Sequence, residues 1–306
     1  MNRRKKIVYM GTPHYAQMIL QKLIDAEDME VGLVLTQPDR PVGRKKVLTP
    51  PSVKVLALEH SIEVLQPERL SEDGIYEAIL AIEPDYIVVA AFGQLLPQSI
   101  LDIAPCINLH ASLLPQYRGA SPVQQSLLNG DSYSGVTAMW MEAGLDSGPI
   151  LGYKYFKIPS QMRLQALMSQ LSVDACELTL DTLRKFEDIE SIPQTRAIAT
   201  HCKKIRRADG EIDFDNAQAI YNAYRAFEGW PGVFTSSGMK LLEIELVESS
   251  KNYKPAEILS IDDKSIRVGC KVGSFTIYRL QPSSKKPMDA KSYLLGKGLK
   301  VGDILI

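Results

Sequence analysis

Residues 106–151 read CINLHASLLPQYRGASPVQQSLLNGDSYSGVTAMWMEAGLDSGPIL, and they contain the side chains on which the predicted fold and function mainly depend. Asn108 and His110 are two positions apart at the end of an apolar run, and alternation along a strand places such positions on one face. Asp146 lies in the turn 144–148, which follows a second apolar run. Open α/β folds bind ligands at the carboxyl ends of parallel strands. We therefore expect the three side chains to converge there.

An amide, an imidazole and a carboxylate form a set suited to acyl transfer. Asn108 and His110 can stabilise a developing oxyanion, and Asp146 can set the protonation of the imidazole or relay a proton. Each residue taken alone has a structural alternative, because a histidine after a strand is often only hydrogen-bonded and an Asp between glycines is a common turn residue. From the residues alone, the catalytic and the structural interpretations both stay open.

The composition is that of an ordinary globular protein. The chain has 306 residues, 45% of them hydrophobic and 23% charged, which allows one to three domains. A net charge of -1 implies no global attraction to nucleic acid, so any basic patch must be local. Four scattered cysteines without a Cys-x-x-Cys pair argue against a zinc site or a disulfide framework. The apolar run before Gly11 is too short for a secretion signal or a membrane span, so we expect a cytoplasmic protein.

Strand-like and helix-like patterns alternate through the first half of the chain. This alternation predicts an α/β fold with a Rossmann-like, mostly parallel sheet and helices on both faces. The turn Gly11-Thr12-Pro13 has one glycine where a dinucleotide fingerprint needs three, so no NAD site is expected. Apolar runs that read as strands occupy residues 6–10, 30–36, 63–66, 86–91 and 149–158.

A long basic loop follows the second predicted strand. Residues 37–46 contain four cations, Arg40, Arg44, Lys45 and Lys46, together with two prolines and a glycine. Such a loop is either a solvated surface segment or a flap that contacts phosphates. We favour the flap, because a long loop with a glycine between a strand and a helix is uncommon without a function.

The composition changes after residue 186, where polar, linker-like residues precede a basic segment that includes Lys203, Lys204 and Arg206. Short strands with glycine-containing turns follow, typical of a small OB-like β-barrel. Residues 264–306 carry nine Lys and Arg against two Asp, a local charge of +7. This concentration of positive charge indicates either a phosphate-binding face or a solvated, lysine-rich surface. The expected domains are a catalytic domain at residues 1–188, a basic linker at 189–207 and a C-terminal domain at 208–306.

The central stretch resembles the formyltetrahydrofolate-dependent formyltransferases. The motifs that carry the resemblance are Asn108-Leu109-His110, Ser112-Leu113-Leu114-Pro115, Arg118-Gly119-Ala120 and Gly144-Leu145-Asp146-Ser147-Gly148. The resemblance implies 10-formyltetrahydrofolate as formyl donor and co-substrate, no metal, and a catalytic role for Asn108, His110 and Asp146. It also implies folate contacts from two loops at strand ends, namely Phe92, Gly93, Ser112, Leu113, Leu114 and Pro115.

The basic loop, the C-terminal domain and the motif Trp230-Pro231-Gly232 are similar to the branch of this family that formylates charged initiator tRNA. The resemblance implies transfer of the formyl group to the α-amine of methionyl-initiator tRNA, which gives N-formylmethionyl-tRNA for translation initiation. We expect a monomer with no membrane partner. The implied tRNA contacts are Arg40, Arg44, Lys45, Lys46, Lys203, Lys204 and Arg206.

Three rival functions share parts of this pattern. A formyltransferase for a small amine, such as a sugar nucleotide or glycinamide ribonucleotide, would keep the Asn-His-Asp set without needing the basic loop. A formyltetrahydrofolate hydrolase would use water in place of the amine. A non-catalytic tRNA- or nucleotide-binding protein would not need all three residues of the Asn-His-Asp set.

Arg118 could bind an anion, but we expect it to pair on the surface.

Overall fold

A computed structural model of the protein describes residues 3–43 and 45–306. The chain forms two compact units, and each contains more than one stretch of sequence. The first consists of Met1–Pro122, Tyr133–Lys157 and Leu167–Cys202, and the second of Val123–Ser132, Ile158–Ala166 and Lys203–Ile306. Residues 189–202, which we expected in a linker, thus lie within the first unit.

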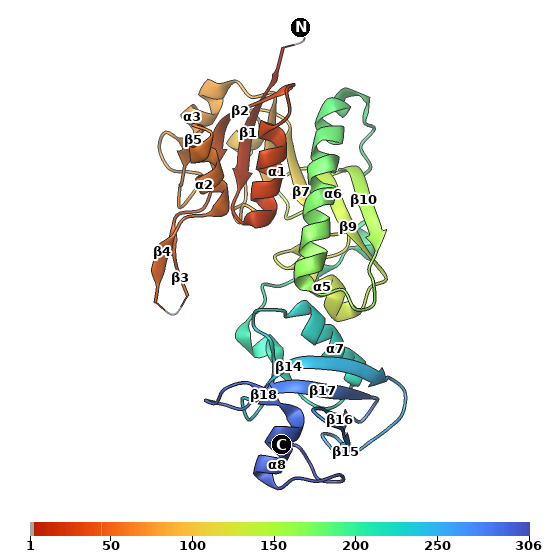
Figure 1. The fold of residues 1–306 in the computed structure, drawn as a ribbon. Helices are drawn as coiled ribbons and strands as arrows, with labels where there is room; N and C mark the ends of the chain where they lie inside the picture. The colour runs from red at the N-terminus through yellow and green to blue at the C-terminus, as the bar shows by residue number, and fades with distance from the viewer. Residues whose placement is uncertain (1–2, 44) are drawn as a thin grey trace. The chain divides into compact units, whose positions relative to one another are not determined.

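The first unit is built on a seven-stranded sheet (Figure 1). Its strand order is β10-β9-β7-β6-β1-β2-β5, in which the five strands from β7 to β5 run parallel and β9 and β10 are antiparallel to their neighbours. The strands are β1 (Lys5–Gly11), β2 (Met29–Leu35), β5 (Glu63–Leu65), β6 (Tyr86–Ala90), β7 (Cys106–His110), β9 (Tyr133–Trp140) and β10 (Ile150–Lys157). The predicted fold class, with a mostly parallel sheet, is confirmed.

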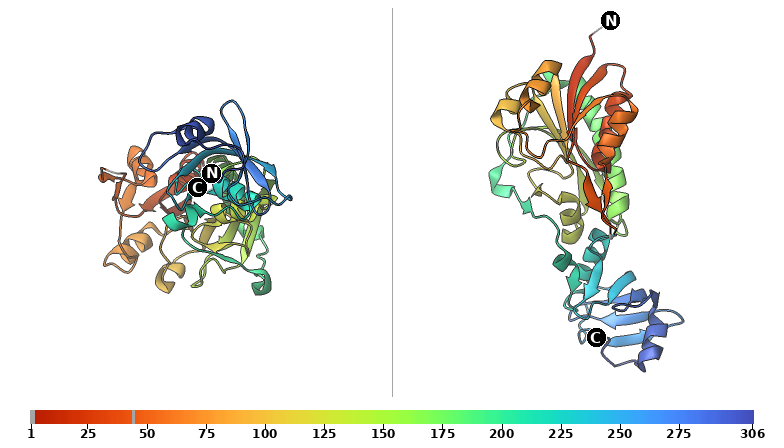
Figure 2. Two further views of the ribbon diagram at one scale, coloured as in Figure 1. Left: turned by 90° about the horizontal axis from the view of Figure 1, so that it is seen from below. Right: turned by 90° about the vertical axis from the view of Figure 1, so that its left-hand side faces the viewer.

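Helices cover both faces of this sheet, as Figures 1 and 2 show. Val8 and Met10 of β1 pack in one apolar cluster with Ile79 and Ile100, which belong to α3 and α4. On the other face, Tyr9 donates a hydrogen bond to the carbonyl of Ala16 in α1. Burial on both faces explains why these strands read as continuous apolar runs. The helices of this unit are α1 (His14–Ile24), α2 (Ser52–Glu59), α3 (Ile75–Ile82), α4 (Gln98–Leu101) and α6 (Leu164–Arg184), which extends into it from the second unit.

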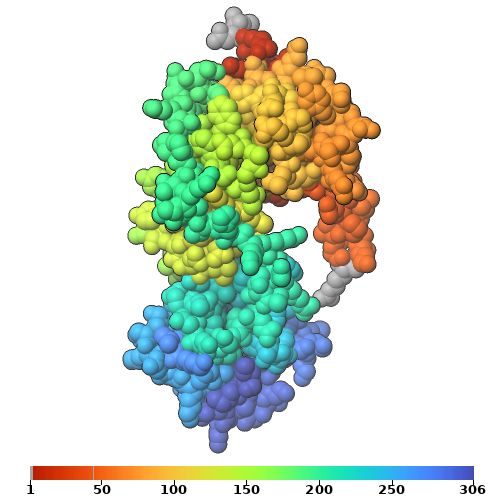
Figure 3. Space-filling view, turned by 180° about the vertical axis from the view of Figure 1, so that it is seen from behind, coloured from red at the N-terminus to blue at the C-terminus, as the bar shows by residue number. Residues whose placement is uncertain are grey.

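Two short strand pairs were not expected from the sequence. The basic loop forms a hairpin of β3 (Arg40–Val42) and β4 (Val47–Thr49), whose residues are exposed and which stands out from the surface of its unit (Figure 3). The second pair joins β8 (Arg118–Gly119) to β11 (His201–Cys202) in parallel. This pair places residues 201–202 of the expected linker directly beside the Arg-Gly motif.

The second unit is mostly antiparallel β, with the strand order β12-β13-β14-β17-β16-β15 and β18 paired to β17. Its core contains Phe214 and Phe275, whose rings stack with centroids 6.0 Å apart. Its elements are α5 (Pro122–Asn129), β12 (Glu211–Ile212), α7 (Ala217–Ala226), β13 (Val233–Thr235), β14 (Lys240–Glu248), β15 (Ile258–Ile261), β16 (Ile266–Gly269), β17 (Ser274–Gln281), β18 (Met288–Asp289) and α8 (Ala290–Lys297).

Helix α7 holds the two stretches of earlier sequence that belong to this unit. The buried amide of Asn222 donates to the carbonyl of Leu128 in α5. The buried guanidinium of Arg225 donates to the carbonyl of Met162 at 2.8 Å. Since buried polar groups need such partners, the second unit cannot be completed by residues 203–306 alone.

The C-terminal end corrects one expectation. We expected short strands throughout this region, but among residues 303–306 only Ile304 pairs, in an isolated bridge with Glu257. Helix α8 precedes them instead, with the Asp289 carboxylate accepting from the Ser292 amide at its N-terminus and Gly298 in the left-handed region at its end. Among the described residues, no helix is long and apolar enough to cross a membrane.

Candidate active site

Strand register brings the predicted catalytic side chains to one edge of the sheet. Val89 of β6 pairs with Asn108 of β7, and Gly11 of β1 pairs with Ala90 of β6, so three parallel strands end together. His110 is the last residue of β7 and is paired to β9, after which comes the turn that carries Asp146. The side chains of Asn108 and His110 are buried in this edge.

The Asp146 carboxylate is the centre of this arrangement. Its Oδ2 accepts a hydrogen bond of 2.8 Å from the backbone amide of Gly119. Its Oδ1 lies 3.3 Å from Nδ2 of Asn108 and 3.8 Å from Nδ1 of His110. The structure thus brings together the three residues predicted from the sequence. Gly119 has φ +113°, and an added Cβ would lie 2.5 Å from the carbonyl oxygen of Cys202, so only glycine fits where this amide meets the carboxylate.

The other ring nitrogen of His110 fixes the orientation of the imidazole. Nε2 lies 3.0 Å from the carbonyl oxygen of Tyr117, and because a carbonyl only accepts, Nε2 is the protonated nitrogen. Nδ1 then faces Asp146, and it becomes a donor when the ring takes up a second proton. An imidazole held beside a carboxylate and an amide donor is a set of groups suited to acyl transfer.

The segment after β7 is a tightly bonded loop. The Ser112 hydroxyl donates to the carbonyl of Gln116 at 2.7 Å, so this predicted folate contact is used within the loop. Thr137 of β9 donates to the Ser112 carbonyl and accepts from the Leu114 amide. Leu114 is buried, and its carbonyl accepts from the Tyr153 hydroxyl, while Leu113 and Pro115 are partly exposed. The loop therefore presents a fixed wall beside Asn108, His110 and Asp146.

The loop after β6 lies at the same edge of the sheet. Phe92 is buried, its carbonyl accepts a hydrogen bond from the Thr12 hydroxyl, and Gly93 has φ +87°. Nε2 of Gln37 lies 3.9 Å from the position a Cβ of Gly93 would occupy. Among the described residues, this nitrogen is one of three buried side-chain polar atoms without a hydrogen-bond partner. A buried donor without a partner indicates a place where a bound ligand can accept.

Two residues that support the site were not predicted from the sequence. Gln194 donates to the carbonyls of Asp146 and Gly148, although the polar residues around it read as a linker. Arg118 was expected on the surface, but it is 7% exposed and donates to the side-chain oxygen of Gln194. The local sequence gives no signal for either contact, because it depends on two chain segments far apart.

The cysteines are unsuited to nucleophilic catalysis. All four are free and buried, and burial raises the pKa of Cys106 to about 12 and that of Cys176 to about 11. Burial also raises the pKa of Cys202, which lies beside the Arg-Gly motif. Thiols with raised pKa values are poor nucleophiles at neutral pH. No group of three His, Cys, Asp or Glu side chains that could hold a metal occurs in the part of the chain that the structure describes.

The residues predicted to contact tRNA lie in both units. Lys45 and Lys46, here called the hairpin lysines, are exposed between β3 and β4, and Arg40 is exposed on β3, where it donates to Gln37. Arg44 lies outside the described residues. In the second unit, Lys203, Lys204 and Arg206 are exposed in one short segment. All described members of the set therefore present their charge to solvent.

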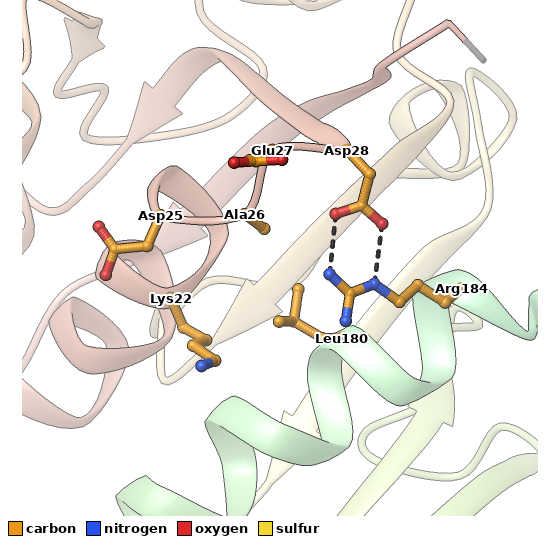
Figure 4. Close-up of a pocket in the computed structure, with 7 residues that line it drawn as sticks. All are labelled: Lys22, Asp25, Ala26, Glu27, Asp28, Leu180 and Arg184. Carbon is orange, nitrogen blue, oxygen red and sulfur yellow. Dashed lines mark hydrogen bonds and ion pairs between the residues drawn. The ribbon is translucent and has the colours of Figure 1, made fainter. Parts of the chain in front are cut away.

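A hollow of about 520 Å³ lies away from this edge of the sheet, between the turn after α1 and the last turns of α6 (Figure 4). The Arg184 guanidinium donates two hydrogen bonds of 2.8 Å to the Asp28 carboxylate there. This interaction lowers the pKa of Asp28 and fastens the end of α6. The hollow contains none of the predicted site residues, and its charged groups are exposed, which is typical of a structural ion pair.

Known proteins resemble this chain along its whole length. The sequence profile described as "Formyl transferase" matches residues 5–182, and that described as "Formyl transferase, C-terminal domain" matches residues 204–298. The methionyl-tRNA formyltransferase of Sulfurovum sp. (strain NBC37-1) is 65% identical over 98% of this chain and 99% of its own. The corresponding protein of Sulfurimonas denitrificans is 51% identical over the same shares of the two chains.

Solved structures show the same fold at low sequence identity. WlaRD, a sugar 3N-formyl transferase crystallised with dTDP and 5-N-formyl-THF, aligns with a TM-score of 0.67 at 16% identity, covering 94% of this chain and 100% of its own. HypX from Aquifex aeolicus in complex with tetrahydrofolic acid aligns with a TM-score of 0.59 at 17% identity, covering 98% of this chain and 48% of its own.

Proposed function

The chain belongs to the methionyl-tRNA formyltransferase family, and from this membership we propose how its residues transfer the formyl group of 10-formyltetrahydrofolate to methionyl-initiator tRNA. Methionyl-tRNA formyltransferase activity follows from the identity of 65% over 98% of the chain. The assignment of roles rests above all on one observation, the convergence of Asn108 and His110 on the Asp146 carboxylate.

In the proposed reaction, the neutral α-amine of methionyl-tRNA attacks the formyl carbon. A bond forms between the amine nitrogen and this carbon, and the bond from the carbon to N10 of the folate then breaks. Asn108 and the protonated Nδ1 of His110 donate to the oxyanion that develops on the formyl oxygen. Asp146 stabilises the imidazolium and passes the amine proton on, directly or through water, and N10 of the leaving tetrahydrofolate takes up a proton.

The proposed folate site lies between the loop after β6 and the wall formed by residues 112–115. The peptide groups of Phe92 and Gly93 and the unpartnered Nε2 of Gln37 supply polar contacts, as a flat ring with several nitrogen and oxygen atoms requires. Leu113 and Pro115 supply apolar contacts, whereas Ser112 and Leu114 shape the loop from within. Mostly apolar walls with a few fixed polar groups are typical of small-molecule sites.

The proposed tRNA contacts are the exposed cations of both units. Arg40 and the hairpin lysines serve in the first unit, and Lys203, Lys204 and Arg206 serve in the second. The Lys and Arg residues of 264–306 add further positive charge. Two of them have partners within the unit, because Lys271 forms an ion pair with Asp215 and Arg267 donates to the Ser274 hydroxyl. Cations that bind phosphates make affinity fall steeply with salt.

The test is a transfer assay with 10-formyltetrahydrofolate labelled on the formyl group. The full chain should move the label to the amine of methionyl-initiator tRNA and release tetrahydrofolate at the same rate. Label released as free formate would indicate a hydrolase. Label transferred to a sugar nucleotide or glycinamide ribonucleotide in preference to charged tRNA would overturn the assignment of the acceptor.

A further inference from the structure

Residues 192–202, here called the connector, are hydrogen-bonded to the part of the first unit that carries Asn108, His110 and Asp146. At one end, Ile192 and Ile150 exchange two backbone hydrogen bonds of 2.8 Å. At the other end, β11 pairs with β8. Between these anchors, the side chains of Gln194 and Thr200 bind the backbone of the catalytic site.

Gln194 fixes the turn that carries Asp146. Its amide nitrogen donates to the carbonyls of Asp146 at 2.9 Å and Gly148 at 2.8 Å. Its oxygen accepts from Nε and Nη2 of Arg118 at 3.0 and 2.7 Å, which determines which end of the amide faces the turn. Asp146 has φ +47°, in the left-handed region that disfavours most residues. The two hydrogen bonds donated by Gln194 therefore hold the backbone of Asp146 in a conformation that this residue would otherwise seldom adopt, and so fix the position of its carboxylate.

Thr200 fixes the peptide that orients His110. Its hydroxyl oxygen accepts from the Tyr117 amide at 2.8 Å, and its carbonyl accepts from the Arg118 amide at 2.9 Å. Tyr117 also has a left-handed backbone, with φ +61°. The carbonyl of Tyr117 is the group that binds Nε2 of His110. A change at Thr200 thus reaches the imidazole through a single residue.

We propose that Gln194 and Thr200 are positioning residues for formyl transfer, Gln194 for the Asp146 carboxylate and Thr200 for the His110 imidazole. This inference rests on the proposed catalytic roles of Asp146 and His110. Neither side chain reaches the reacting atoms, so each acts on the rate of the chemical step and leaves substrate binding nearly unchanged. Misplacing a catalytic group by about 1 Å can cost about a hundredfold in rate.

The experiment compares two isosteric substitutions in the full chain. Gln194→Glu keeps an oxygen for Arg118 but replaces the donor to Asp146 with a carboxylate oxygen, and Thr200→Val keeps the shape but removes the acceptor for Tyr117. Each should lower kcat at least about tenfold, with KM for folate and tRNA within about threefold. Thr200→Ser, which keeps the hydroxyl, should restore kcat.

The matched controls are Gln161→Glu and Thr195→Val. Gln161 is exposed, and Thr195 makes no cap hydrogen bond at the start of its short helix. The ¹⁵N shifts of His110 supply a second readout, because loss of the Tyr117 contact should reduce the Nε2–H tautomer in Thr200→Val. Values of kcat within twofold of the controls for both variants would overturn the inference, provided that the unsubstituted chain formylates tRNA. A chain without transfer activity would overturn the proposed function as well.

Discussion

Substitution of Asp146 by Asn tests the role of its charge. Asn is nearly isosteric and can still accept from the Gly119 amide, so the fold should be kept. The substitution removes a negative charge 3.8 Å from Nδ1 of His110. At this separation and an effective dielectric constant of about 20, a pair of unit charges interacts by about 4 kcal/mol. Since 1.36 kcal/mol corresponds to a factor of ten in rate, the largest expected loss of kcat is about a thousandfold.

The assay is single-turnover formyl transfer, with the melting temperature and KM for folate measured on the same samples. The expected result is a fall in kcat of about a hundred- to a thousandfold, because partial exposure to water weakens the charge pair. Glu142→Gln is the matched control, since it removes an exposed carboxylate four positions away. A kcat for Asp146→Asn within threefold of that control would show that the Asp146 charge does not stabilise the imidazolium.

Three further outcomes are expected. Gly119→Ala should lower the free energy of unfolding by about 1–3 kcal/mol and reduce kcat, because its Cβ would meet the carbonyl of Cys202; unchanged melting and kcat would contradict this. Asp28→Asn should lower the melting temperature at neutral pH by the equivalent of at most about 1 kcal/mol. The ion pair with Arg184 lowers the folded-state pKa of Asp28, so its stabilisation is present at neutral pH and is lost as the pH falls through that pKa. The melting temperatures of the two proteins should therefore converge in acid, and a constant difference would exclude this ion pair as the cause. Alanine at both hairpin lysines should weaken tRNA binding and reduce its log-log salt slope by about one unit for each phosphate that is no longer neutralised, whereas Lys185→Ala should not; an unchanged slope would argue against phosphate binding by the hairpin.

The sequence predicts the strands of the first sheet and the main catalytic candidates. Apolar runs such as residues 86–91 are continuous because both faces of the sheet are covered, and the spacing of Asn108 and His110 places them on one face of β7. Helix α8 was missed although its N-cap and its terminal glycine are visible in the sequence. Only Ala290 and Leu294 are buried in it, so its apolar periodicity is weak.

The contacts of the connector could not be predicted from local patterns. Gln194 binds the carbonyl of a residue 48 positions earlier, and nothing in a polar segment after a helix indicates such a partner. Arg118 was wrongly expected on the surface because an arginine without a neighbouring carboxylate usually stays solvated. Here the amide of Gln194 supplies the missing acceptor and allows Arg118 to be buried.

The interleaving of the two units in sequence has a consequence for synthesis on the ribosome. The first unit needs β11, so it cannot be completed until residue 202 has emerged, well after its sheet is available. The carbonyls of Leu128 and Met162 lack their hydrogen-bond donors for longer still, until Asn222 and Arg225 have been translated. Domains of multidomain chains usually fold one after another as they emerge. In this chain the turn that carries Asp146 receives its Gln194 contacts late, so a nascent chain stalled before residue 194 would carry Asp146 without these hydrogen bonds.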